Sequence, residues 1–218
     1  RWSKIVTPLR NAMRYDFRPS YLKIAEIREI IPDAPVLALT ATATPKVVDD
    51  IQEKLRFKEK NVFRKSFARS NLAYVVRTTE NKEDYLLKIL KNVPGTSVVY
   101  VRNRKKTKEI AEFLVQNGIT AEHFHAGLKN ETKDERQNRW KNDETRVIVS
   151  TNAFGMGIDK PDVRSVIHLD LPDSLEAYFQ EAGRAGRDEK KAYAVLLYNN
   201  GDAVKMRKRV SDTFPPKE

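Results

Sequence analysis

The hydrophobic residues of this chain form short, mostly β-branched runs that alternate with longer segments of helical periodicity. Short apolar runs predict buried strands, and apolar positions three and four residues apart predict amphipathic helices. The strands are predicted at 36–41, 61–67, 97–101, 120–125, 146–151, 163–170 and 191–199. The helices are predicted at 44–57, 104–118, 130–143 and 174–187, with a basic helix at the C-terminus. This alternation predicts an α/β fold, a parallel sheet flanked by helices.

The residues at the predicted helix ends support these boundaries. Thr44 and Ser174 stand where an N-cap side chain accepts a backbone hydrogen bond, and Pro45 follows in the first turn. Gly118 stands at the end of the helix that begins at residue 104, where glycine commonly terminates a helix.

The polar motifs of the chain follow its predicted strands. They are TATAT at 40–44, RNRKKTK at 102–108 and TNAFGMGIDKPD at 151–162. Because ligands of open parallel sheets bind beyond the carboxyl ends of the strands, we expect these motifs to lie along one sheet edge. One α/β run ends and another begins near FARSNLAYVV, so we expect two domains, residues 1–70 and 71–218.

The composition favours a protein that meets polyanions. The 218 residues are 40% hydrophobic, enough for a core, while charged residues make up 33% and the net charge is +11. Such a surplus favours nucleic acid or nucleotide phosphates as partners, although a well-solvated basic surface explains it equally well. The absence of cysteine excludes disulfides, thiolate zinc sites and cysteine nucleophiles. No apolar run approaches membrane-spanning length.

The segment YFQEAGRAGRDEK, residues 178–190, carries the most specific candidate chemistry. Arg184 and Arg187 each follow a glycine, and Gln180 lies four residues before the first arginine. The planar guanidinium group binds phosphate oxygens in pairs. In nucleotide hydrolases such an arginine stabilises the transferring phosphoryl group and accelerates the reaction by about 10³–10⁵. A basic turn is the alternative interpretation of this segment taken alone.

Two glycine- and histidine-containing motifs are less specific. Gly157 precedes Asp159 in AFGMGIDKPDV, a pattern of close ligand approach or of an ordinary turn. His123 and His125 in HFHAGL occupy alternate strand positions and therefore face one way. Because no third metal ligand is evident nearby, contact with a phosphate or with the next motif is favoured over metal binding.

The remaining motifs also carry two interpretations each. The hydroxyl row at 40–44 can hydrogen-bond across a lobe interface or only cap a helix. The cations at 102–108 stand at a strand-to-helix junction that suits phosphate, but Lys105, Lys106 and Lys108 fit a solvated helix face equally well.

Taken in order, these motifs strongly resemble motifs III to VI of the RecQ helicases of superfamily 2. The matching segments are LALTATAT, VVYVRNRKK, HFHAGL, VIVSTNAFGMGIDKPDVRSVIHLDLP and YFQEAGRAGRD. The segment YDFRPSY at 15–21 resembles the second half of the RecQ aromatic-rich loop, and the resemblance extends to about Tyr198. A DEAD-box RNA helicase is expected to have Ser-Ala-Thr and an initial histidine where this chain has Thr40-Ala41-Thr42 and Tyr178-Phe179-Gln180.

The resemblance implies the fold and the activity of that family. It implies two RecA-like lobes of the P-loop NTPase type, of which residues 1–70 are the end of the first and residues 71–218 the complete second. It implies ATP and Mg²⁺ between the lobes, 3′-to-5′ movement on single-stranded DNA, unwinding of forked duplex, and a role in DNA repair and recombination. No membrane partner is implied, and the expected location is the bacterial cytoplasm at the nucleoid, or the nucleus in a eukaryote.

The resemblance also implies roles for individual residues. Arg187 is the expected arginine finger, and Arg184 and Gln180 are its companions. Asp159 and Gly157 are expected at the nucleotide, and Thr40 and Thr42 are expected to couple ATP state to lobe closure. Phe17 and Arg18 are expected to sense DNA. The candidates for contact with the DNA backbone are Asn103, Arg104, His125, Ser150 and Thr151.

Three elements of the family pattern are missing from the sequence. It has no G-x-x-x-x-G-K-S/T loop, no Asp-Glu-Ala-His box and no Gln-Trp-Gly start to the aromatic loop. Since the first two cradle phosphates and hold Mg²⁺, we expect a truncated fragment that is inactive alone. Two alternatives stay open: a non-enzymatic basic nucleic-acid-binding module, and another superfamily 2 helicase that acts on RNA.

Overall fold

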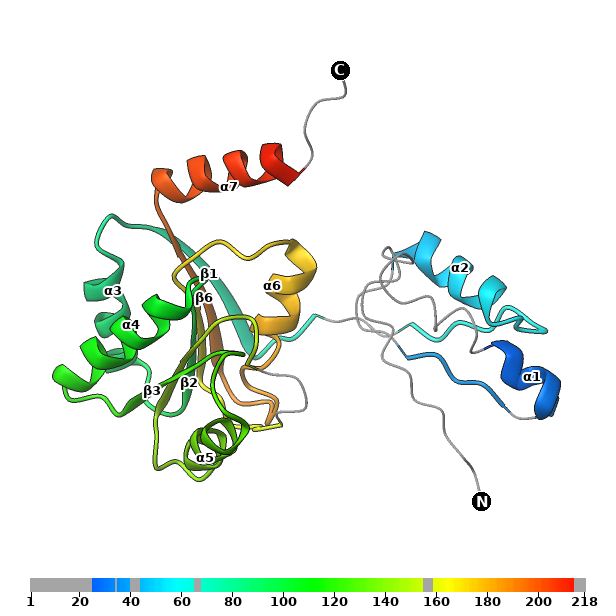
Figure 1. Cartoon of the computed structure of the whole chain (residues 1–218), viewed down its shortest axis with the longest axis horizontal. Helices are drawn as coiled ribbons and strands as arrows, with labels where there is room; N and C mark the ends of the chain where they lie inside the picture. The colour runs from blue at the N-terminus through cyan, green and yellow to red at the C-terminus, as the bar shows by residue number, and fades with distance from the viewer. Residues whose placement is uncertain (1–24, 34, 40–43, 65–67, 155–158, 214–218) are drawn as a thin grey trace. The chain divides into compact units, whose positions relative to one another are not determined.

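The computed structural model describes residues 25–33, 35–39, 44–64, 68–154 and 159–213. The chain divides into two compact units, Arg1–Phe67 and Ala68–Glu218 (Figure 1). In the part of the chain that the structure describes, no helix is both long enough and apolar enough to cross a membrane.

A parallel sheet of six strands forms the centre of the larger unit. The strands are β1 (Leu72–Thr78), β2 (Ser97–Tyr100), β3 (Ala121–Phe124), β4 (Val147–Ser150), β5 (Ser165–His168) and β6 (Ala192–Tyr198). Their order across the sheet is β1-β6-β5-β2-β4-β3, and every neighbouring pair is parallel. This confirms the predicted α/β fold with a parallel sheet flanked by helices.

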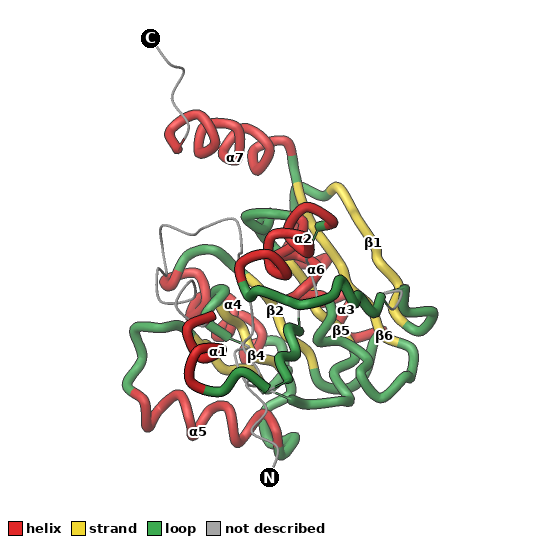
Figure 2. The backbone as a smooth tube through the Cα atoms, turned by 90° about the vertical axis from the view of Figure 1, so that its right-hand side faces the viewer, coloured by secondary structure: helices red, strands yellow, loops and turns green. Residues whose placement is uncertain are grey.

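Helices cover both faces of this sheet (Figures 1 and 2). The helices α3 (Lys82–Asn92) and α4 (Arg104–Gln116) bury Leu86, Leu90, Ile110 and Leu114 against one face. On the other face, α5 (Asn130–Lys141) contributes Trp140, and α6 (Leu175–Ala182) contributes Tyr178 and Ala182. The last helix, α7 (Asn200–Thr213), follows β6 directly. The strands β2, β4 and β5 are buried along their whole length, which explains why they read as uninterrupted apolar runs.

Capping residues position the helices near the site. The side chains of Asn103 and Ser174 accept hydrogen bonds from the backbone of Lys105 and Ala177, which fixes the starts of α4 and α6. Gly118 has a φ of 77°, which ends α4 as predicted. The helix predicted at 174–187, however, ends at Ala182, and the chain then turns through Gly186, whose φ is 60°.

The smaller unit contains α1 (Ile27–Ile30) and α2 (Pro45–Lys54). Thr44 caps α2 by accepting a hydrogen bond from the amide of Val47, as predicted. The strands predicted at 36–41 and 61–67 do not form within the described residues of those segments, apart from a single bridge at Leu39. A strand needs hydrogen-bonded neighbours, and Leu37, Leu39 and Phe63 are exposed rather than packed in a sheet.

Two elements of the larger unit were not predicted. The strand β1 lies in the segment interpreted only as a change of unit, and α3 follows it. The strand β1 lies at the edge of the sheet, and its second half is mostly exposed. It therefore lacks the uninterrupted apolar run that marks the central strands. Its pairing with β6 therefore decides its conformation.

Candidate functional site

The turn that carries Arg184 and Arg187 lies between α6 and β6. The amide of Gly186 donates to the carbonyl of Val163 at 2.8 Å, and the amide of Asp188 donates to the carbonyl of Pro161 at 3.0 Å. Both acceptor residues precede β5, so the turn lies near the amino end of that strand. We call residues 183–187 the arginine turn.

Gly186 is essential to the shape of the arginine turn. Its φ of 60° lies in the left-handed region, which side chains other than glycine rarely adopt. A Cβ atom there would approach the Cβ of Ala192 to 2.7 Å and both Nδ2 of Asn71 and the carbonyl of Lys190 to 2.8 Å. The small residues around the arginines thus allow close backbone packing.

Arg187 meets Asp159 in an exposed ion pair. The guanidinium Nη1 lies 2.7 Å from Oδ1 of the carboxylate, and the side chains are 38% and 81% exposed. Two residues assigned to the nucleotide from separate motifs are therefore brought together. The arginine is accessible to an anion that could take the place of the carboxylate.

Arg184 is half-buried, and its guanidinium group lies near the Tyr100 hydroxyl. Burial raises the pKa of the Tyr100 hydroxyl well above its usual range, and the nearby Arg184 cation opposes part of that shift. The Tyr100 hydroxyl donates to the carbonyl of Phe154 at 3.1 Å. Arg184 is thereby tied to the end of β2 and to the loop after β4, while Arg187 remains outside.

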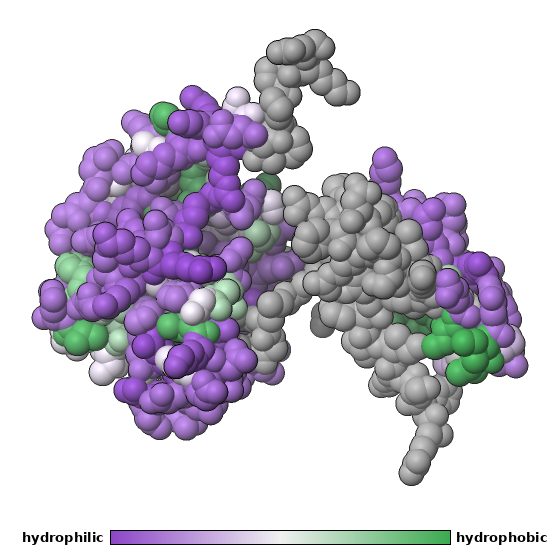
Figure 3. Space-filling model, in the orientation of Figure 1, coloured by the Kyte–Doolittle hydropathy of each residue, from purple (hydrophilic) through white to green (hydrophobic). Residues whose placement is uncertain are grey.

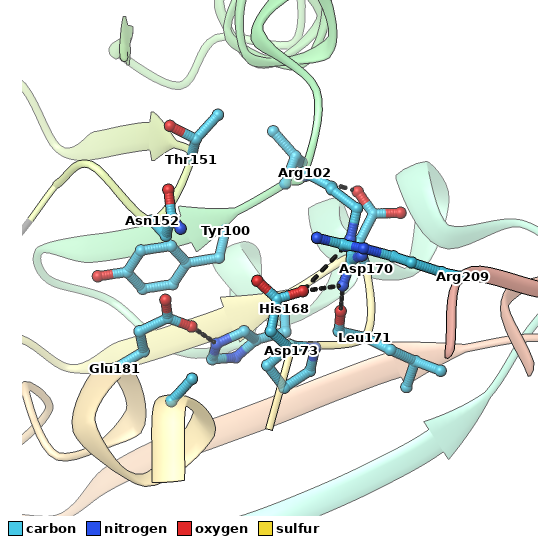
Figure 4. A pocket seen from close by; sticks show the side chains of 13 residues that line it. Tyr100, Arg102, Thr151, Asn152, His168, Asp170, Leu171, Asp173, Glu181 and Arg209 are labelled. Carbon is cyan, nitrogen blue, oxygen red and sulfur yellow. Dashed lines mark hydrogen bonds and ion pairs between the residues drawn. The ribbon is translucent and has the colours of Figure 1, made fainter. Parts of the chain in front are cut away.

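A pocket of about 180 Å³ opens where β2, β4 and β5 end (Figure 4). At its base Glu181 meets Nε2 of His168 at 2.8 Å, and the His168 ring stacks on Tyr100 with centroids 5.1 Å apart. At its rim Arg102 and Arg209 both pair with Asp173 at 2.9 Å. Of these residues, the sequence analysis singled out only Arg102, within the cation motif at 102–108. The available signal was a histidine inside the apolar strand VIHLD.

The described residues that are predicted to meet DNA lie at the carboxyl ends of β2, β3 and β4 or just after them. Asn103 uses its side chain to cap α4, and Arg104 reaches across to the loop after β3, where its Nη1 lies beside Gly127 and His125. Thr151 is half-buried. Ser150 is fully buried, and its hydroxyl donates to the carbonyls of Phe124 and Thr151, so it is occupied within the fold.

The two histidines of HFHAGL lie together in a positive environment. Their ring centroids are 5.8 Å apart. Burial, followed by the Arg136 cation, lowers the pKa of His123 to about 4, and burial, followed by Arg104, lowers the pKa of His125. Both rings are therefore neutral near pH 7. Among the described residues, no three His, Asp or Glu side chains gather in a way that could hold a metal ion.

The lysines of the predicted cation cluster lie on a solvated helix face. Lys105 pairs with Glu109 at 3.5 Å and Lys108 with Glu112 at 3.6 Å, one helical turn away in each case. The surface of the larger unit seen in Figure 3 is largely hydrophilic. Arg104, rather than these lysines, reaches the loop that follows β3.

A buried lysine holds the segment next to Asp159. Lys160 is only 5% exposed, and its ammonium group lies 2.9 Å from Asp143 and 3.2 Å from Asp162. It also donates to the carbonyl of Lys141 at 3.1 Å and lies 5.8 Å from the centroid of the Trp140 ring. Sequence analysis missed it, because a lysine in a loop gives no sign of burial.

The structure separates the predicted residues into two groups. The DNA candidates lie at the carboxyl edge of the sheet, whereas the arginine turn is held near the amino ends of β5 and β6. Gln180 is exposed on α6. The other predicted residues lie outside the described part of the chain: Phe17, Arg18, Thr40, Thr42 and Gly157.

Known proteins with similar sequences are helicases. The helicase conserved C-terminal domain matches residues 81–189. The RecQ-like DNA helicase blm-1 of Caenorhabditis elegans is 41% identical over 91% of this chain and 20% of its own length. The ATP-dependent DNA helicase RecQ of Bacillus subtilis is 42% identical over 88% of this chain and 33% of its own length. A relative from Acanthamoeba polyphaga mimivirus, 41% identical over 94% of this chain and 38% of its own length, is named as an RNA helicase.

Solved structures support the same fold. A DEAD box protein from Methanococcus jannaschii aligns over 93% of this chain and 56% of its own with a TM-score of 0.60 and 24% identity. Dbp5 of S. cerevisiae, bound to RNA and ADP BeF3, aligns over 90% of this chain and 53% of its own with a TM-score of 0.63 and 20% identity. At these identities the likeness concerns the fold alone. The chain spans between 20% and 38% of the length of the three curated relatives above.

Proposed function

This chain belongs to the helicase conserved C-terminal domain family and is of the RecQ type, and we propose that the protein works as an ATP-dependent 3′-to-5′ DNA helicase. The observation that carries the proposal is the exposed ion pair between Asp159 and Arg187, the latter on a turn that backbone hydrogen bonds fix. Translocation on single-stranded DNA, opening of forked duplex, and service in repair and recombination are parts of the same proposal.

In this proposal Arg187 stabilises the negative charge that develops on the transferring phosphoryl group. Its link to Asp159 is weak, because an exposed ion pair contributes about 0–1 kcal/mol. A phosphate can therefore take the place of the carboxylate at little cost. Arg184 keeps the turn near Tyr100, and Gln180 is exposed on α6. Bound Mg²⁺ would supply charge neutralisation on the phosphates.

The carboxyl edge of the sheet is proposed to hold the DNA backbone. Arg104 supplies positive charge, while Asn103, His125 and Thr151 supply neutral hydrogen-bonding groups near it. Contacts of this kind recognise phosphate and sugar, so we expect strong salt dependence and little sequence preference. Phe17 and Arg18 as DNA sensors, and Gly157, Thr40 and Thr42 as nucleotide and coupling residues, remain parts of the proposal.

Two other functions have specific support. The mimivirus relative is named as an RNA helicase, which favours RNA as an alternative polymer. The net charge of +11 favours a non-enzymatic binding module. Each predicts a different outcome of the same assay.

The test is ATP turnover and strand separation by the full-length protein with matched single-stranded DNA and RNA. The proposed function predicts turnover that DNA stimulates more than RNA, and unwinding only of a duplex with a 3′ single-stranded tail. Stronger stimulation by RNA supports the RNA alternative. Tight binding without ATP turnover supports the binding module and contradicts the proposal.

A further inference from the structure

The side chain of Arg69, which belongs to none of the motifs, binds the backbone of the arginine turn. Arg69 donates from Nη1 to the carbonyl of Gly183 at 3.0 Å and from Nη2 to the carbonyl of Ala185 at 2.8 Å. The same Nη2 also contacts the carbonyl of Gly186. One guanidinium group thus binds three backbone oxygens of the turn that carries Arg184 and Arg187.

Asn71 extends this contact by two residues. Its Nδ2 donates to the carbonyl of Gly186 at 2.7 Å and to the carbonyl of Lys190 at 2.9 Å. The backbone of Asn71 in turn accepts a hydrogen bond from the amide of Ala192, the first residue of β6. The segment before β1 is therefore bound along the whole path from the arginine turn to β6.

Arg69 lies close to the boundary between the two compact units. The first compact unit ends at Phe67, and Arg69 is the second residue of the next unit. The segment with which the second unit begins is therefore the segment that holds the arginine turn. No motif of the family pattern described above covers Arg69.

The chemistry of the contact explains why an arginine stands there. The carbonyls of Gly183, Ala185 and Gly186 follow the last residue of α6, near the negative end of its helix dipole. A cation with a planar fork satisfies several of these oxygens in one fixed orientation, which a lysine with a single ammonium group cannot reproduce. The turn is thereby fixed through its backbone, which leaves the side chain of Arg187 available to Asp159.

We propose that Arg69 is a positioning residue for the arginine pair and links the start of the second unit to the geometry of the phosphate-binding arginines. Arg69 contacts neither phosphate nor the reacting atoms in this proposal, and it acts only through the backbone of residues 183–186. The proposal rests on the proposed function, since it assigns Arg69 a part in ATP turnover.

The kinetic test compares variants of the full-length protein in steady-state ATP turnover with saturating single-stranded DNA. We expect Arg69→Ala to lower kcat by about 10- to 100-fold, because a small displacement of a catalytic group has an effect of that size, with KM for ATP little changed. Arg69→Lys should recover only part of the loss. The control is Arg77→Ala, which removes an exposed arginine from β1 and should leave kcat unchanged.

A double-mutant cycle separates positioning from general damage to the fold. If Arg69 acts through the arginine turn, Arg69→Ala in an Arg187→Ala background should lower kcat no further. Losses that multiply in the double variant would overturn the proposal. Full activity of the Arg69→Ala protein, when Arg187→Ala is inactive, would also overturn it. If the alanine variant unfolds, full activity of the Arg69→Lys protein would have the same meaning.

Amide hydrogen exchange provides a readout that does not depend on activity. Arg69→Ala should accelerate exchange in peptides that cover residues 183–190 and leave peptides from α4 unchanged. If the wild-type protein does not turn over ATP, the proposed function fails. The exchange result alone then decides whether Arg69 holds the backbone of the arginine turn. Unchanged exchange at 183–190 would contradict the inference under either result.

Discussion

The guanidinium group of Arg187 lies 2.7 Å from the carboxylate of Asp159, although the two residues lie on opposite sides of β5 in the sequence. Both side chains are exposed to solvent, so water and salt screen the attraction between them. The ion pair fixes the position of the Arg187 side chain, but the interaction itself is weak. An arginine held in this way suits exchange between a protein carboxylate and a phosphate.

Replacement of Arg187 by alanine should nearly abolish ATP turnover. Removing an arginine that stabilises the transferring phosphoryl group is expected to lower kcat by about 10³–10⁵, with ATP binding mostly retained. Steady-state kinetics together with nucleotide titration would measure both quantities. An equal loss of nucleotide affinity would contradict the assignment of Arg187 as an arginine finger.

Replacement of Gly186 by alanine should destabilise the larger unit more than replacement of Gly118. Both glycines have positive φ, so alanine at either position is expected to cost about 1–2 kcal/mol in backbone strain. Only at Gly186 does the new Cβ meet neighbouring atoms, whereas at Gly118 nothing lies within 4 Å. The Gly186 variant should therefore lose about 1–3 kcal/mol more in urea unfolding. Equal losses would argue against the tight packing of the arginine turn.

Replacement of Lys160 by methionine should weaken the fold near Asp159. The ammonium group is buried and hydrogen-bonded, but its carboxylate partners are 64% and 47% exposed and remain hydrated without it. We therefore expect a loss of about 1–3 kcal/mol in the free energy of unfolding. The matched change of Lys108, which is 63% exposed, should stay within about 0.5 kcal/mol.

The free energy of unfolding should fall as the pH drops from about 6.5 towards 4. The pKa of His123 is lowered from 6.5 to about 4, chiefly by burial. In that range His123 binds a proton in the unfolded chain but stays largely neutral in the folded protein, so protonation favours unfolding. Below about pH 4 both states are protonated at His123 and its contribution no longer changes.

Substitution of His123 by glutamine tests this pH dependence. It should reduce the difference in unfolding free energy between pH 7.5 and pH 5 by about 1 kcal/mol or less, since the ring is partly exposed. His125 has a lowered pKa as well, so the double variant should flatten the profile further. Lowered pKa values of Asp143 and Asp188 act at more acidic pH and do not enter this window. An unchanged slope in the double variant would refute the prediction.

Replacement of Arg104 by alanine should weaken the binding of single-stranded DNA and its salt dependence together. One lost phosphate contact is expected to reduce the slope of log affinity against log salt by about 1, with little change in sequence preference. Lys88→Ala, an equal change of charge on the exposed side of α3, is the control. Fluorescence anisotropy at several salt concentrations gives both slopes. Equal slopes for both variants would place the DNA elsewhere.

Much of the fold could be predicted because its signals are local. The central strands are buried on both faces and therefore read as apolar runs, and Thr44 or Ser174 marks a helix start by its own side chain. The edge strand β1 and the end of α6 were mispredicted or missed because partners distant in the sequence decide them. The strands predicted before residue 68 fail in the described residues for the same reason.

The sequence by itself determined the strands β2 to β6 and the helices α4 to α7 of the larger unit, the caps at Thr44 and Ser174, and the motifs that resemble those of RecQ helicases. Only the tertiary structure decided which distant residues meet: Arg187 with Asp159, and Arg69 with the carbonyls of the arginine turn. The physical reason is the strand order β1-β6-β5, which brings the starts of strands far apart in the chain side by side. Hydrogen bonds between such segments depend on that arrangement, and no periodicity within either segment encodes it.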